Sequence, residues 1–219
     1  MKHPVVTIDG PAGAGKSTVA RRLARRLDYR FVPSGDIYRV IAWRVAAGVP
    51  LDAVLAGTRI EFLGSPEQQR VVVNGEDVTE ALRAPQMSDL TSSLSQRPEV
   101  RAFADALQRR LASAEPVVVE GRDAGTLVFP EADCKFYLDA SLEVRAARRL
   151  ADRRSRGETA DLAGVREALA ARDLADRTRA MAPLRRTEDA IYIDSSGMSI
   201  DEVIELMAKE VERVCSTSS

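Results

Sequence analysis

The sequence predicts an α/β fold in which a parallel sheet of about five strands is covered by helices on both faces. Apolar, β-branched segments recur at residues 5–9, 29–32, 116–120, 134–139 and 190–194. Segments with helical spacing of apolar residues lie between them, at 16–27, 36–47, 98–114, 141–156, 162–176 and 200–214. Such alternation is typical of a parallel sheet whose connecting helices bury both of its faces. The 219 residues suffice for one such core with a small insertion.

The first strand leads into a glycine-rich run at residues 10–18, GPAGAGKST. The run matches the pattern G-x-x-x-x-G-K-[ST], and it stands between a strand and a helix as that pattern requires. Glycines allow backbone N–H groups to surround a phosphate, Lys16 can reach terminal phosphates, and the Ser17 hydroxyl can bind Mg²⁺. The run therefore predicts a nucleotide-binding phosphate loop made of Gly10, Pro11, Ala12, Gly13, Ala14, Gly15, Lys16, Ser17 and Thr18.

Residues 58–92 interrupt the alternation of strands and helices. RIEFLG and RVVVNGEDVT predict short antiparallel strands, and the second segment contains an Asn74-Gly75 turn of the kind that needs positive φ. We expect an inserted subdomain that closes over a second substrate, although a hairpin without a binding role remains the alternative. Residues 1–57 and 93–219 would then form the core of one domain.

An arginine-rich segment follows the fourth predicted strand. Residues 145–186 contain 12 arginines and six acidic residues, whereas the whole chain has a net charge of -1. Such a run is usually a solvated, salt-bridged helical pair, and we assign most of its arginines to that role. The break RRSRGE at 153–158 indicates a hinged lid at about 150–162. Arginines on a lid that closes over ATP would stabilise charge on a transferred phosphoryl group.

Composition narrows the classes of function. The near-neutral net charge gives no basic field for a nucleic-acid polymer. No segment approaches the roughly 18 apolar residues of a membrane span, and none resembles a secretion signal, so we expect a cytoplasmic protein. The only histidine is His3, and Cys134 and Cys215 have no metal-ligand spacing. We therefore expect no catalysis by histidine or cysteine and no metal site built from them.

Three further motifs follow elements that this topology brings close to the phosphate loop. They are PSGDIYR at 33–39, VEGRDAGT at 119–126 and RDLADRTRAMAPL at 172–184. Together with IDGPAGAGKST, KFYLDAS and the insert, and in this order, they resemble the bacterial cytidylate (CMP) kinases. That family belongs to the nucleoside monophosphate kinase group of P-loop proteins, and the resemblance covers essentially the whole chain.

The resemblance implies that a monomer transfers the γ-phosphoryl group of ATP to CMP or dCMP with the help of Mg²⁺, which Ser17 would bind. It implies that the catalytic charges come from Lys16, Arg122 and Arg179. The residues implied to hold the acceptor are Ser34, Arg39, Arg122 and Arg179 for its phosphate, Ser92, Arg101 and Asp123 for cytosine, and Arg172 and Asp176 for the ribose.

Three positions near the site differ from the usual family residues. Pro33 stands where Asp is usual and Asp36 where a small residue is common, so the wall around the acceptor phosphate is expected to differ. Glu120 stands where Asp is often seen, and we interpret it as a neighbour of the magnesium ion.

The chemistry of the residues agrees with this assignment. A nucleoside monophosphate is largely a dianion at pH 7, so its oxygen can attack without a general base, which accounts for the missing histidine. Asp123 can accept a hydrogen bond from the amino group of cytosine, whereas uracil presents an oxygen there. We therefore expect CMP and dCMP to be preferred over UMP.

Other readings of the sequence remain open. One is a kinase of this type that acts on UMP, dTMP or a small alcohol, for which the aspartate of GRD could serve as the base. A regulatory GTP-binding switch is disfavoured because no lysine lies in an Asn-Lys-x-Asp motif. An ATP-binding module without turnover is a third alternative.

Overall fold

The computed structural model describes residues 3–83 and 87–216 and contains a five-stranded parallel sheet. The strands follow the order β2-β6-β1-β7-β8, and every neighbouring pair is parallel. Their bounds are Val5–Asp9 (β1), Arg30–Pro33 (β2), Val117–Glu120 (β6), Cys134–Asp139 (β7) and Ile191–Asp194 (β8). The predicted parallel sheet is confirmed.

The described part of the chain contains eight α-helices. They are Lys16–Leu27 (α1), Ser34–Ala46 (α2), Leu51–Gly57 (α3), Met87–Leu94 (α4), Pro98–Ala114 (α5), Leu142–Ser155 (α6), Leu162–Thr178 (α7) and Ile200–Ser216 (α8). The six predicted helices are all present, whereas the sequence did not predict α3 and α4. Both are short and pack against α2, so tertiary contacts rather than their own periodicity stabilise them.

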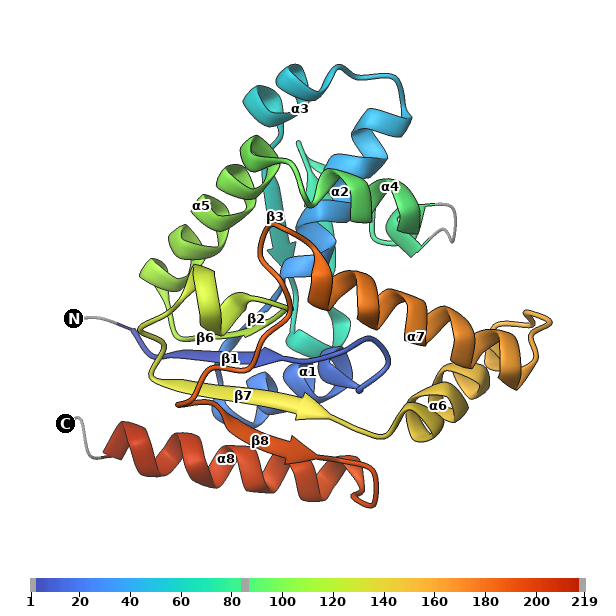
Figure 1. The fold of residues 1–219 in the computed structure, drawn as a ribbon. Coiled ribbons are helices and arrows are strands. Elements are labelled where there is room, and N and C mark those ends of the chain that lie inside the picture. The colour runs from blue at the N-terminus through green and yellow to red at the C-terminus, as the bar shows by residue number, and fades with distance from the viewer. Residues whose placement is uncertain (1–2, 84–86, 217–219) are drawn as a thin grey trace.

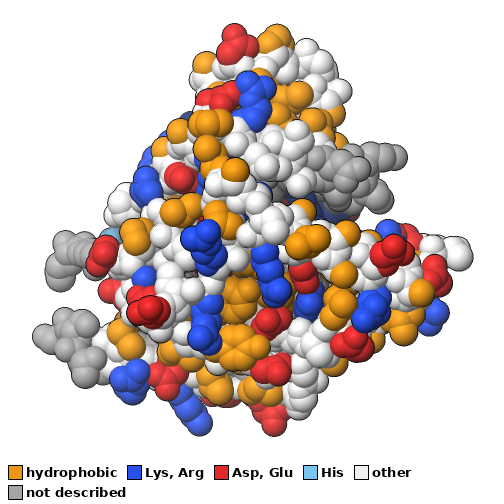
Figure 2. Space-filling model, in the orientation of Figure 1, with side chains coloured by type: hydrophobic (Ala, Val, Ile, Leu, Met, Phe, Trp, Pro, Cys, Tyr) orange, Lys and Arg blue, Asp and Glu red, His pale blue; other side chains and the backbone are white. Residues whose placement is uncertain are grey.

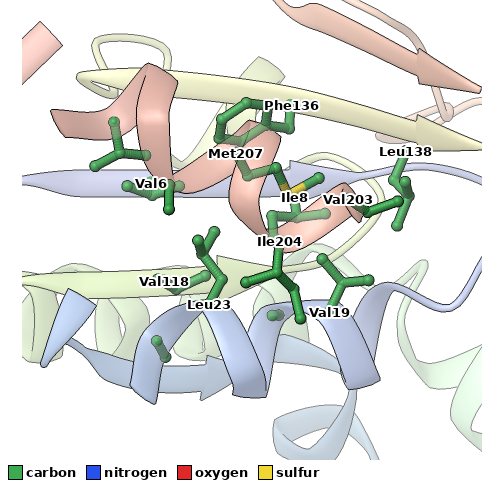
Figure 3. Close-up of a cluster of buried hydrophobic side chains, with 14 of the residues drawn as sticks. Val6, Ile8, Val19, Leu23, Val118, Phe136, Leu138, Val203, Ile204 and Met207 are labelled. Carbon is green, nitrogen blue, oxygen red and sulfur yellow. The ribbon is translucent and has the colours of Figure 1, made fainter. Parts of the chain in front are cut away.

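The main core lies between the sheet and helices α1 and α8. Ile8 of β1 and Phe136 and Leu138 of β7 pack against Leu23 of α1 and Met207 of α8 (Figure 3). All five side chains are at most 1% exposed. Alternate strand residues point to the opposite face, where a smaller cluster forms, so both faces of the sheet are buried.

A three-stranded antiparallel sheet forms within residues 58–92. Its strands are Ile60–Leu63 (β3), Arg70–Val73 (β4) and Glu76–Asp77 (β5). Asn74 and Gly75 have φ angles of 52° and 89°, which confirms the predicted turn. The sheet shares one apolar cluster with α2 and α5, so its core extends beyond the predicted insert. Part of that insert, residues 84–86, lies outside the described residues, and its boundaries stay a prediction.

The carboxyl ends of the strands face the region where α6 and α7 lie (Figure 1). Helix α6 ends at Ser155 and α7 begins at Leu162, with the Asp161 carboxylate accepting a hydrogen bond from Gly164 N at 2.8 Å. The face seen in Figure 2 carries interspersed acidic and basic side chains. None of the helices in the described ranges has both the length and the apolar character that a membrane span requires.

Candidate active site

The phosphate loop links β1 to α1 at the carboxyl end of the central strand. Gly10 has a φ of 149°, and a Cβ there would collide with the carbonyl oxygen of Leu138. The loop therefore needs glycine where it passes β7. Lys16 opens α1, is 5% exposed, and donates a hydrogen bond from Nζ to the carbonyl oxygen of Pro11 at 2.8 Å.

Several cations lie close together around Lys16. Burial, together with the charge of Arg122, lowers the pKa of Lys16 to about 7 against the opposing effects of Glu120 and Asp9. Burial and the charge of Arg122 also lower the pKa of the Arg172 guanidinium. Lys16 is buried, Arg122 is partly buried and Arg172 is exposed, and cations that destabilise one another in this way form a site that an anion would stabilise.

Two hydroxyl groups meet Glu120 at the end of β6. Ser17 Oγ donates to Glu120 Oε2 at 3.0 Å, and Ser34 Oγ donates to the carbonyl oxygen of Glu120 at 2.7 Å. Hydroxyl and carboxylate oxygens are the ligands that Mg²⁺ prefers. No group of three or more His, Cys, Asp or Glu residues that could hold a metal ion occurs in the described part of the chain. Protein oxygens at Ser17 and Glu120 thus suit an ion whose remaining ligands are phosphates and water.

A buried network of arginines and aspartates lies beside the phosphate loop. Asp123 forms an ion pair with Arg101 of α5 and lies 3.7 Å from Arg179 Nη2. Arg122 Nε donates to Asp176 Oδ2 at 2.9 Å, and Asp176 Oδ1 lies 3.8 Å from Arg179 Nη1. All five side chains are 20% exposed or less. The loop after β6 therefore meets α5 and the end of α7 in one charged network.

Asp9, at the end of β1, supports this network, and the sequence interpretation did not assign it a role. It is 4% exposed and accepts hydrogen bonds from Ala124 N at 3.0 Å and Gly125 N at 2.7 Å. Burial raises its pKa to about 6, although the two hydrogen bonds oppose that shift. Asp9 thereby connects the strand before the phosphate loop to the segment after Arg122 and Asp123. A carboxylate as the last residue of a buried strand was the available signal.

Arg39 and Ser92, two further residues predicted to bind the acceptor, lie in different surroundings. Arg39 Nη1 lies 3.4 Å from Asp36 Oδ1, and the charge of Arg39 contributes to the lowered pKa of Arg172. Ser92 is exposed on α4, and its carbonyl oxygen accepts a hydrogen bond from Ser95 Oγ at 2.8 Å. Among the described residues, the Ser92 side chain takes no part in the ion pairs of Arg101 and Asp123.

Comparison with known proteins adds independent findings. The model of the cytidylate kinase family matches residues 6–213. A cytidylate kinase of Geobacter sulfurreducens is 46% identical over 210 residues, covering 93% of this chain and 90% of the relative. A cytidylate kinase of Geobacillus kaustophilus is 42% identical over 223 residues, covering 98% and 100%.

Solved structures resemble the chain in fold. A gluconokinase from Sinorhizobium meliloti aligns with a TM-score of 0.51 at 15% identity, covering 99% of this chain and 96% of that chain. A protein from Thermus thermophilus aligns with a TM-score of 0.51 at 24% identity, covering 96% and 98%. These similarities support the predicted parallel-sheet fold.

Proposed function

The chain belongs to the cytidylate kinase family, and we propose that it transfers the γ-phosphoryl group of ATP to CMP and to dCMP, forming CDP and dCDP. Beyond family membership, one structural observation carries the proposal. Cations gather beside the phosphate loop, where the charges of Arg122 and Arg172 oppose protonation of the buried Lys16. Cations placed in this way suit the binding of two phosphorylated substrates.

The transfer requires little covalent chemistry from the protein. The acceptor phosphate is largely a dianion at pH 7, so no side chain has to remove a proton before attack. The protein must hold two anions in line and stabilise the charge that develops between them. We assign this stabilisation to Lys16, Arg122 and Arg179, with Ser34 and Arg39 helping to bind the acceptor phosphate.

Magnesium fits the oxygen ligands near the phosphate loop. The Ser17 hydroxyl would bind the ion, and the Glu120 carboxylate, 3.0 Å from Ser17 Oγ, would orient that hydroxyl or a bound water. When bound, Mg²⁺ neutralises phosphate charge. Ser17 and Glu120 are therefore the two protein groups that we expect to influence the magnesium requirement.

Selectivity for cytosine is assigned to Arg101 and Asp123. Asp123 can accept a hydrogen bond from the cytosine amino group, and Arg101, its ion-pair partner, can donate to the ring nitrogen or carbonyl oxygen. Uracil has a carbonyl oxygen in place of the amino group and a ring N–H in place of the unprotonated ring nitrogen. Because a buried site rejects a base that leaves polar groups unpaired, UMP should be a poor acceptor. We place the ribose near Arg172 and Asp176 and leave Ser92 as a further contact to the base.

Closure of the enzyme completes the proposal. The lid at about 150–162 and the insert at 58–92 would close over the substrates and exclude water that would otherwise hydrolyse ATP. We further propose that the enzyme acts as a cytoplasmic monomer on small-molecule substrates.

Transfer of label tests the proposed reaction. The protein is incubated with Mg²⁺, CMP and ATP labelled in the γ-phosphoryl group, and the products are separated. We expect labelled CDP from the wild type and a severe loss of labelled CDP for Lys16→Met, because that variant lacks the cation of the phosphate loop. Label that remains in ATP or appears only as inorganic phosphate would contradict the proposal.

A further inference from the structure

The tip of the phosphate loop is attached to α6 and α7 by a buried ion pair. Asp173 Oδ1 accepts a hydrogen bond from Ala12 N at 3.2 Å, and Asp173 Oδ2 accepts one from Arg145 Nη1 at 2.6 Å. Arg145 Nη1 also donates to the carbonyl oxygen of Ala12 at 2.9 Å. Both polar groups of the Ala12 backbone are therefore held by this pair.

Burial makes these contacts strong constraints. The side chains of Arg145 and Asp173 are 6% and 9% exposed. Arg145 Nε donates to the carbonyl oxygen of Ala140 at 2.9 Å, which satisfies the guanidinium further. A buried charge that loses its partner is costly, so the two side chains hold one arrangement.

Apolar packing supports the same attachment. Ala12 belongs to one cluster with Ala146 and Leu150 of α6 and with Val165 and Leu169 of α7. A Cβ at the next residue, Gly13, would lie 3.3 Å from Arg145 Cβ. The absence of a side chain at Gly13 therefore lets the loop approach α6 closely.

Helix α7 extends from this attachment to the proposed acceptor site. Arg172 and Asp176 are four residues apart and share one side of the helix, Asp173 lies on the adjoining side, and Arg179 directly follows the last residue of α7. Asp176 pairs with Arg122, and Arg179 lies beside Asp123. One rigid helix thus contacts the ATP-binding loop through Asp173 and the acceptor network through its other charged residues.

We propose that Asp173 and Arg145 are positioning residues that attach the phosphate loop to α7 and thereby couple the binding of ATP to the binding of CMP, an inference that rests on the proposed function. Nucleotide that orders the phosphate loop also fixes α7, and α7 carries the groups that meet the acceptor. By the reciprocity of coupled binding, CMP must strengthen the binding of ATP by the same factor.

The variant Asp173→Asn tests the coupling. Asparagine keeps the shape of the side chain, but it has only one acceptor oxygen and can no longer accept hydrogen bonds from both Ala12 N and Arg145. The dissociation constant of CMP is measured by calorimetry, with and without a non-hydrolysable ATP analogue and Mg²⁺. For the wild type we expect the analogue to tighten CMP binding by a factor of about 5 to 150, the usual range for coupled sites. For Asp173→Asn we expect that factor to fall toward one while CMP alone binds as in the wild type.

Two further variants separate coupling from folding. Asp201→Asn removes an exposed carboxylate of α8 that pairs with Arg22, outside the proposed lid and insert, and it should keep the wild-type factor. The double variant Arg145→Met/Asp173→Leu replaces the buried pair with apolar groups of similar size, a change that proteins often tolerate. We expect it to fold and to lose the coupling. If the pair served stability alone, the double variant would unfold at a lower temperature and keep the wild-type coupling factor. That result would overturn the proposal.

Amide exchange provides a readout that does not depend on CMP. The N–H of Ala12 should exchange slowly in the wild type without nucleotide, and faster in Asp173→Asn. Equal exchange in the two proteins, or a wild type that binds both ligands without coupling, would overturn the inference. If the wild type fails to bind CMP while Ala12 remains protected by Asp173, the proposed function fails but the attachment of the loop stands.

Discussion

Binding of ATP should draw a proton onto Lys16. In the free protein, burial and the charge of Arg122 lower the pKa of Lys16 to about 7, so most molecules carry a neutral Lys16 at pH 8. A triphosphate placed beside this amine favours its charged form. The complex therefore holds more protons than the free protein, and binding of ATP at pH 8 should take up a large fraction of one proton.

Calorimetry measures this uptake. ATP and Mg²⁺ are titrated at pH 8 in two buffers with different ionisation enthalpies, and the difference in observed heat gives the number of protons bound. Lys16→Arg should abolish the uptake, because a guanidinium is already charged at this pH. Lys135→Arg is the matched control, since Lys135 is the other buried lysine among the residues that the structure describes and pairs with Asp189 at 2.7 Å. Heats that are independent of buffer, or an uptake that persists in Lys16→Arg, would refute the reasoning.

Three other predictions concern selectivity and stability. Asp123→Asn should reduce the ratio of kcat/KM for CMP to kcat/KM for UMP by about tenfold or more, because an amide can donate to the uracil oxygen. The control Asp105→Asn removes another carboxylate near Arg101 and should leave this ratio unchanged. Folding raises the pKa of Asp9 from 3.8 to about 6, so between these pH values the folded protein binds more protons than the unfolded one. The free energy of unfolding therefore falls as the pH rises through this range. Relative to Asp9→Asn, which does not titrate, the wild type should lose about 1 kcal/mol of unfolding free energy between pH 5 and pH 7 in urea titrations, and a constant difference would rule out this pKa. Phe136→Ala empties a core position that is 1% exposed and should cost about 3 to 5 kcal/mol, so a loss below about 1 kcal/mol would contradict the packing in Figure 3.

The sequence predicted the main sheet and the phosphate loop because both depend on local patterns. Strands β1, β2, β6 and β7 are almost wholly buried and therefore form continuous apolar runs in the sequence, whereas the edge strand β8 is partly exposed. The loop has fixed spacing between Gly10, Gly15 and Lys16. Helices α3 and α4 were missed because they are short and depend on packing against α2. No local pattern indicates such contacts.

The polar interior was harder to predict than the apolar one. Most arginines of residues 145–186 were assigned to solvated ion pairs, and the pair of Arg166 with Glu143, at 56% and 68% exposure, is of this kind. Arg145 lies in the same run but is buried against Asp173. Its burial follows from the approach of the phosphate loop to α6, which no spacing of charged residues reveals. Asp9 escaped notice for the same reason, since its partners lie more than 100 residues away.

The choice of acceptor tests the central claim most directly. Release of ADP is measured with ATP and Mg²⁺ for CMP, dCMP, UMP, AMP and dTMP at equal concentrations, and kcat/KM is compared. The account predicts that CMP and dCMP are the favoured acceptors, because we propose that the ion pair of Arg101 and Asp123 binds the hydrogen-bonding edge of cytosine. Equal kcat/KM for CMP and UMP, or turnover of none of the five, would contradict it.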